Sequence, residues 1–144
     1  MTSRLNPYLS FKSDARQAME FYHDVFGGEL NTQTFAEGGM SQGPEDANLV
    51  MHAQLDAPNG MTLMGSDTPP SMEYHAPGGI SISLSGDDDS ELSGYWQKLA
   101  EGGTVTMPLE AAPWGDKFGM LTDRYGIGWM VNIAGTPATG SDAG

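Results

Sequence analysis

The fold follows from residues 5–28, LNPYLSFKSDARQAMEFYHDVFGG. Residues 5–11 alternate apolar and polar side chains, which predicts a strand. Asp14 then supplies a helix cap, and Gly27 and Gly28 end the segment that follows. Between them one apolar face recurs at helical spacing, made of Ala15, Ala18, Met19, Tyr22, Val25 and Phe26. The stretch is therefore a strand followed by an amphipathic helix.

Strands alone are expected in the rest of the first half. They are predicted near residues 29–35, 49–55 and 61–64, with the last two joined in a hairpin that turns at 58–60. A Gly-rich loop around 38–46 and a connection at 66–77 separate these elements from one another and from the second half. The first half thus has the order β-α-β-β-β.

The same order returns from residue 80, where ISISLSGDDDSELSGYWQKLAEGG occupies residues 80–103. Strands are then predicted at 104–109, 118–122 and 128–133. A constant offset of 75 residues aligns Asp14 with Asp89, Phe21 with Trp96, and the Gly27-Gly28 pair with Gly102-Gly103. A repeat of this kind indicates two copies of one structural unit.

We therefore expect an α+β fold in which two paired βαβββ units form an open, barrel-like mixed sheet with the helices outside. The units are placed at 5–66 and 78–134, within a single domain spanning 1–134, and residues 135–144 are expected to form a flexible tail. Each unit alone is about 60 residues long and would be marginally stable, so each must bury a face against the other. A cleft between the strands is a common place for a small ligand.

Composition excludes several classes of function. Nineteen acidic residues against six basic ones give a formal net charge of −13, which argues against nucleic acid and membrane surfaces as partners. The chain has no cysteine, so disulfides, thiolate metal sites and a cysteine nucleophile are absent. No signal peptide or membrane-spanning apolar run is visible, and a cytoplasmic location is the default expectation.

Three stretches resemble the vicinal oxygen chelate superfamily, also called the glyoxalase/bleomycin-resistance/dioxygenase proteins, and within it the PhnB-like group. They are residues 6–11 with the helix to Gly28, residues 50–53 with 63–67, and residues 114–119 with 123–126 and 129–132. Together they span nearly all of residues 5–134. The resemblance implies the paired βαβββ fold and usually a homodimer, and it implies no single activity.

Metal-dependent members of this superfamily hold a divalent ion with His, Gln and Glu side chains from the first and last strands of each unit. In this sequence, the four corresponding places fall on Pro7, on residues 80–82 (Ile80, Ser81 and Ile82), on Leu63 or Met64, and on Met130. All four offer poor ligands for Zn, Ni, Fe or Mn. We therefore expect no metal at this site and no cofactor.

The sequence contains no motif for other catalytic chemistry. The chain has no Gly-x-Gly-x-x-Gly after a strand, no Walker motif, no Gly-x-Ser-x-Gly elbow, and no Gly-rich loop of the kind a methyltransferase needs for its adenosine. His23, His52 and His75 do not lie at metal-ligand spacing. Asp87, Asp88 and Asp89 are most simply helix caps and solvated charge.

An apolar pocket remains. Its candidate ligand-binding residues are Trp114, Phe118, Trp129, His52, Met64, Tyr8, Asp67 and Asn132, with Met51 beside them. Trp114 is the strongest candidate because it sits in a Pro-Trp-Gly turn, where a core role is less expected. The sequence thus favours a small-molecule-binding protein. A metal-dependent lyase, isomerase or dioxygenase and a dimerising module without a ligand stay as alternatives.

Overall fold

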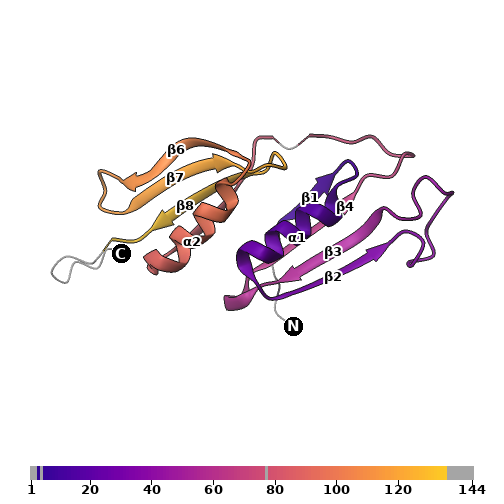
Figure 1. The fold of residues 1–144 in the computed structure, drawn as a ribbon, viewed down its shortest axis with the longest axis horizontal. Coiled ribbons are helices and arrows are strands. Elements are labelled where there is room, and N and C mark those ends of the chain that lie inside the picture. Colours follow the sequence, from indigo (N-terminus) through magenta and orange to yellow (C-terminus); the bar gives the residue numbers. More distant parts are fainter. Residues whose placement is uncertain (1–2, 4, 77, 136–144) are drawn as a thin grey trace. The chain divides into compact units, whose positions relative to one another are not determined.

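The computed structural model describes residues 3, 5–76 and 78–135, and the chain divides into two compact units, residues 1–77 and 78–144. The first unit contains β1 (Tyr8–Phe11), α1 (Ala15–Phe26), β2 (Glu29–Thr34), β3 (Val50–Asp56), a short 3-10 turn (Pro58–Gly60) and β4 (Thr62–Asp67). The second contains β5 (Ser81–Gly86), α2 (Asp89–Ala100), β6 (Thr104–Ala111), β7 (Lys117–Thr122) and β8 (Gly128–Ile133) (Figure 1).

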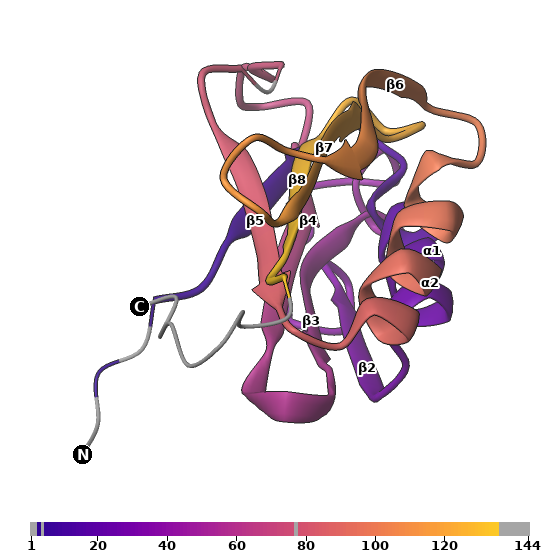
Figure 2. The ribbon, with the colours of Figure 1, turned by 90° about the vertical axis from the view of Figure 1, so that its left-hand side faces the viewer.

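The first unit is a four-stranded mixed sheet with one helix. The strand order is β1-β4-β3-β2, with β1 parallel to β4 and the other pairs antiparallel. Helix α1 lies along one face of this sheet (Figures 1 and 2). Its apolar stripe, which includes Met19 and Tyr22, is buried together with Ala53 and Leu55 of β3. Burial of this stripe positions the helix and leaves the opposite face of the sheet free of it.

The second unit repeats this architecture. Its strand order is β5-β8-β7-β6, again with a single parallel pair, β5 and β8, at one edge. Leu92 and Leu99 of α2 are buried, as are Leu121, Trp129 and Val131 of the sheet. The expected α+β fold, with two βαβββ units, is therefore confirmed.

The offset between the units differs from the expected constant value. Helix α1 starts at residue 15 and α2 at residue 89, an offset of 74. The buried helix positions agree with this value, because Ala18 and Val25 correspond to Leu92 and Leu99. The glycine pairs return to an offset of 75, because Glu101 stands between Ala100, the last residue of α2, and the second glycine pair, whereas Gly27 directly follows α1. Tyr22, not Phe21, therefore corresponds to Trp96.

The second glycine of each pair lies where a side chain would not fit. A Cβ atom added to Gly28 would collide with the backbone carbonyl of Asp56, at the end of β3. A Cβ atom added to Gly103 would collide with the carbonyl of Thr122, at the end of β7. In both units the chain thus leaves the helix by passing close to the end of the same strand, which only glycine permits.

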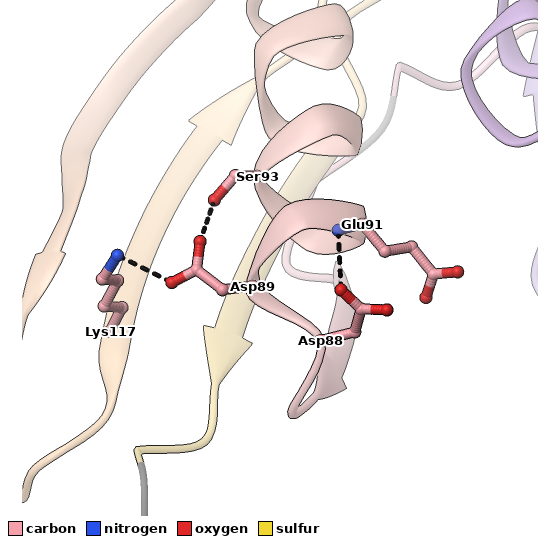
Figure 3. Close-up of polar contacts among 5 residues, drawn as sticks. All are labelled: Asp88, Asp89, Glu91, Ser93 and Lys117. Carbon is pink, nitrogen blue, oxygen red and sulfur yellow. Dashed lines mark hydrogen bonds and ion pairs between the residues drawn. The ribbon is translucent and has the colours of Figure 1, made fainter.

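One helix cap differs from that expected and the other agrees with it. Asp14 precedes α1 but makes no side-chain capping bond; instead, Asp67 Oδ1 accepts from the Ala15 N–H at 2.8 Å. In the second unit Asp88, one of the three predicted cap residues, caps α2, and its carboxylate accepts from the Glu91 N–H at 3.1 Å (Figure 3). Asp89 lies in the first turn and bonds Ser93 and Lys117.

Several strand boundaries differ from those predicted from the sequence. Strand β4 runs to Asp67, beyond the predicted end at residue 64, and β1 begins at Tyr8 instead of at residue 5. Of the predicted tail at 135–144, all but Gly135 lies outside the described residues. Within the described part of the chain, no helix has the length and apolar character needed to cross a membrane.

Candidate functional site

Each sheet has one face turned away from its helix, and these faces carry most of the predicted site residues. We call the first unit's surface face 1, made of Tyr8, Ser10, His52, Gln54, Met64 and Ser66. We call the second unit's surface face 2, made of Ser83, Met107, Glu110, Phe118, Met120, Met130 and Asn132. Alternation along the strands places these side chains opposite the buried, helix-facing residues.

Face 1 is centred on a hydrogen bond between two predicted residues. The Tyr8 hydroxyl lies 3.2 Å from His52 Nδ1, and the two ring centroids are 5.7 Å apart. Met64 of β4 lies between them in the sheet, opposite Tyr8 in the parallel register and opposite Gln54 in the antiparallel one. Tyr8 is 49% exposed, so the pair presents both apolar ring surface and hydrogen-bonding groups to solvent.

Face 2 carries a row of thioethers. Met107 pairs with Met120 across β6 and β7, and Met120 pairs with Met130 across β7 and β8. Cross-strand partners of this kind project on the same side of a sheet, about 5 Å apart. Met107 is 46% exposed and the other two are partly exposed. The row is therefore a flexible, polarizable apolar surface that can adapt to the shape of a ligand.

Next to this row lies an aromatic pair. Trp114 is in the turn between β6 and β7, is 62% exposed, and packs edge-on against Phe118 with a centroid distance of 5.8 Å. Gly115, with φ of 98°, completes the turn, and its N–H donates to the Ala112 carbonyl. The indole is thus held at the end of a hairpin and is not part of the core, as its Pro-Trp-Gly context predicts.

Asn132 lies on face 2 opposite Phe118. Its Nδ2 donates to Asp116 Oδ2 at 3.0 Å, and the Gly135 N–H donates to Asp116 Oδ1 at 2.9 Å. The Asn132 bond, followed by the Gly135 bond, lowers the pKa of Asp116 below its ordinary value of 3.8. Asn132 therefore holds this carboxylate in place and keeps its side-chain oxygen as a hydrogen-bond acceptor.

Two predicted residues lie in the interior of the units. Asp67 is buried, and its carboxylate accepts from the Ala15 N–H at 2.8 Å and from the Val50 N–H at 2.9 Å. Trp129 is 2% exposed, and its Nε1–H donates to Asp123 Oδ2 at 2.8 Å. Since both side chains face the helices, they give structural support to the sheets, and we leave them out of the proposed ligand surface.

The side chains that the edge strand pairs β1–β4 and β5–β8 contribute to the two faces do not suit a divalent metal. The edge pairs β1–β4 and β5–β8 are fully described, and opposite the helices they offer only hydroxyls, thioethers, the Asn132 amide and no carboxylate or imidazole. Across residues 3, 5–76 and 78–135, no three His, Asp or Glu side chains lie close enough to hold an ion. Zn, Ni, Mn and Fe(II) favour imidazole and carboxylate ligands, which these positions lack.

A cavity of about 280 Å³ lies in the first unit, between the loop that joins β2 to β3 and the segment after β4. It is lined by Gln42, Gly43, Glu45, Asp46, Pro70 and Ser71. Both carboxylate oxygens of Asp46 are already bonded, to the Ser41 hydroxyl and the Gln42 N–H, and these bonds lower its pKa. None of the predicted site residues lines this cavity, and it offers no apolar surface comparable to face 2.

Five contributors to face 2 are not among the predicted ligand-binding residues: Ser83, Met107, Glu110, Met120 and Met130. The alternation in residues 118–122 does place Phe118 and Met120 on one face, which was a usable signal. The pairing of Met107 with Met120, and of Glu110 with Phe118, depends on two irregularities in the β6–β7 register. Bulges of this kind have no reliable signal in a single sequence.

Comparison with known proteins identifies the family. Residues 4–131 match the Glyoxalase/Bleomycin resistance protein/Dioxygenase superfamily. Protein YjdN from Escherichia coli K12 is 30% identical over 142 residues, which cover 90% of this chain and 94% of that protein.

Solved structures agree with this match. Protein PA1353 from Pseudomonas aeruginosa is 39% identical, with a TM-score of 0.79 over 94% of this chain and 100% of that one. The PhnB protein from Bacillus cereus, described as a candidate 3-demethylubiquinone-9 3-methyltransferase, is 27% identical, with a TM-score of 0.73 over 92% and 100%. The likeness to PhnB confirms the resemblance seen in the sequence. The chain belongs to the Glyoxalase/Bleomycin resistance protein/Dioxygenase superfamily.

Proposed function

We propose that this chain binds a small, largely apolar organic molecule on face 2, and that it does so without a divalent metal. The observation that carries the proposal is the exposed Trp114–Phe118 pair beside the row of Met107, Met120 and Met130. An exposed tryptophan and thioethers form the kind of surface that packs against a planar ligand. Burying such a surface is favourable by roughly 25 cal/mol per Å² of apolar area.

Face 1 supports the same class of function with more polar chemistry. The Tyr8–His52 pair offers a hydroxyl and an imidazole beside the Met64 thioether. A few convergent polar groups on an otherwise apolar surface are typical of sites that orient a small ligand. We extend the proposal to face 1 as a ligand surface of its own, with these three residues as hydrogen-bonding and apolar contacts, and to the homodimer that the family resemblance implies.

A metal-dependent reaction is the competing function. Chelation of two substrate oxygens needs an ion with open coordination positions held by protein ligands. The thioethers of Met64 and Met130 stand where the resemblance implies such ligands, and thioethers are poor ligands for these ions. This donor chemistry favours sequestration of a ligand over metal-assisted turnover.

The first experiment follows the neutral fluorescent probe N-phenyl-1-naphthylamine and metal ions in parallel. We expect saturable binding of the probe that a chelator does not change. Trp114→Ala should weaken it about tenfold, because an aromatic contact contributes about 1 kcal/mol beyond its buried area. Trp114→Phe, which keeps an aromatic ring, is the matched control and should retain most of the affinity.

Calorimetry with Zn, Ni, Mn and Fe(II) tests the competing, metal-dependent function. We expect no stoichiometric binding at micromolar affinity. One ion bound per chain at that affinity would contradict the metal-free proposal, as would a requirement for the ion in probe binding. Failure of the probe to bind, or binding whose affinity Trp114→Ala leaves unchanged, would remove face 2 as the site.

A further inference from the structure

The basic residues of the second unit all lie toward its helix. The described part of this unit contains three, Lys98, Lys117 and Arg124. Lys98 is in α2, and the Lys117 ammonium lies 2.7 Å from Asp89 in the first turn of α2 (Figure 3). Arg124 Nε donates at 3.1 Å to the carbonyl of Glu101, the C-cap residue of α2. No cation among the described residues of this unit is placed on face 2.

Face 2 carries carboxylates instead. Glu110 is exposed and pairs with Phe118 across β6 and β7, so that it projects on the same side as the aromatic ring. Asp116 lies at the start of β7 and is fixed by Asn132, which also belongs to face 2. Asp116 is charged at neutral pH, as a carboxyl group with an ordinary pKa also is. The exposed Trp114 and the partly exposed Phe118 are therefore flanked by two negative charges.

Alternation of side chains along β7 explains why basic and acidic groups lie on opposite sides of this sheet. Along β7, Phe118 and Met120 project on face 2, while Gly119 packs so close to α2 that an added Cβ atom would lie 2.7 Å from the Trp96 ring. Lys117 precedes this series and points toward Asp89 at the helix. Period-two alternation thus directs the ammonium to one side of the sheet and the apolar and acidic groups to the other.

We infer that face 2 selects aromatic organic cations, with a planar ring against Trp114 and Phe118 and the positive nitrogen near Glu110. This inference rests on the proposed function and adds the charge of the ligand to it. Aromatic faces attract cations through the ring quadrupole, and a neighbouring carboxylate adds to this attraction. The net charge of −13 concentrates cations near the protein and repels anions in the same way.

The test compares three quinolines that differ in charge. N-methylquinolinium is the cation, 4-methylquinoline is a neutral analogue with the same number of heavy atoms, and quinoline-4-carboxylate is the anion. Titration by calorimetry at about pH 8 keeps the second compound neutral. We expect the cation to bind about tenfold more tightly than the neutral analogue, the anion to bind weakest, and added salt to reduce the difference.

Two variants and a matched control locate the effect. Glu110→Gln should weaken the cation about fivefold and leave the neutral compound unchanged, whereas Trp114→Ala should weaken both. Glu91→Gln removes the same charge from the first turn of α2, on the other side of the sheet, and should change neither. Thermal unfolding of each variant confirms that the fold is retained.

The possible outcomes separate the two proposals. If none of the three compounds binds, the planar-ligand site of the proposed function is overturned together with the inference. If neutral 4-methylquinoline binds as tightly as the cation and Trp114→Ala weakens the binding of both, the proposed function stands and the inferred selection for cations is wrong. Equal effects of Glu110→Gln and Glu91→Gln would reduce the selection to the overall charge of the protein, which also contradicts a specific role for face 2.

Discussion

At the scale of single residues, Asp67 connects three elements of the first unit. From the end of β4 its carboxylate accepts the first N–H of α1 and the first N–H of β3, at 2.8 and 2.9 Å. Asp67→Asn replaces one acceptor oxygen by an NH2 group, which leaves one of these buried N–H donors unsatisfied. We expect a loss of about 1–3 kcal/mol in the free energy of unfolding, measured by urea denaturation.

The control for this variant is Asp56→Asn, which changes an exposed carboxylate at the end of β3 that accepts from the side chains of Gln54 and Thr62. A surface substitution of this kind should change stability by less than about 0.5 kcal/mol. An equal effect of the two substitutions would show that Asp67 contributes only general charge and that its two backbone bonds carry no special weight.

Tryptophans show what a single sequence can predict about individual residues. The turn context of Trp114 predicts an exposed ring, and the ring is 62% exposed. The sequence also predicts Trp129 as a ligand contact, yet its side chain is buried and its indole N–H donates to Asp123. The difference comes from which face of β8 points toward α2. One sequence shows that strand residues alternate between faces but does not show which face is covered.

At the scale of elements, the first turn of α2 contains an ion pair that links it to β7. Asp89 accepts from the Lys117 ammonium at 2.7 Å and from the Ser93 hydroxyl at 2.9 Å. These bonds, the Lys117 bond first, lower the pKa of Asp89 below its ordinary value of 3.8. Because the pKa is lower in the folded state, the ion pair stabilises the protein above about pH 4 and is lost as the pH falls through the folded-state pKa.

Lys117→Met tests this dependence. We expect the variant to unfold at a slightly lower urea concentration than the wild type at neutral pH, since both charged groups are about half exposed. The gap between the two midpoints should close as the pH falls through the lowered folded-state pKa of Asp89, because the carboxyl is then protonated in both states. A gap of the same size at low and neutral pH would mean that lost packing of the lysine stem, and not its charge, causes the effect.

The elements themselves were largely predictable, whereas the contacts that bound them were not. Apolar spacing alone located both helices, and glycine pairs located their ends. The α1 cap was predicted at Asp14, next in the chain, but it comes from Asp67, more than fifty residues away. Local sequence patterns carry no information about such long-range partners, which is also why the end of β4 was placed too early.

At the scale of the whole molecule, the family resemblance implies a homodimer, and we expect sedimentation equilibrium to give about twice the chain mass of 15.3 kDa. Two copies of a chain with a net charge of −13 repel each other, so the dimer should be weakest at low ionic strength and strengthen as salt is added. A single species at the chain mass across this range of salt would exclude the dimer at the concentrations used.

The row formed by Met107, Met120 and Met130 has a chemical consequence for the whole protein. Oxidation turns a methionine thioether into a sulfoxide, which is polar, chiral and a strong hydrogen-bond acceptor. Three neighbouring sulfoxides would convert the most adaptable apolar part of face 2 into a wet surface, without a change in the backbone. Peroxide would then lower the affinity of face 2 for an apolar ligand, and methionine sulfoxide reductases would restore that affinity.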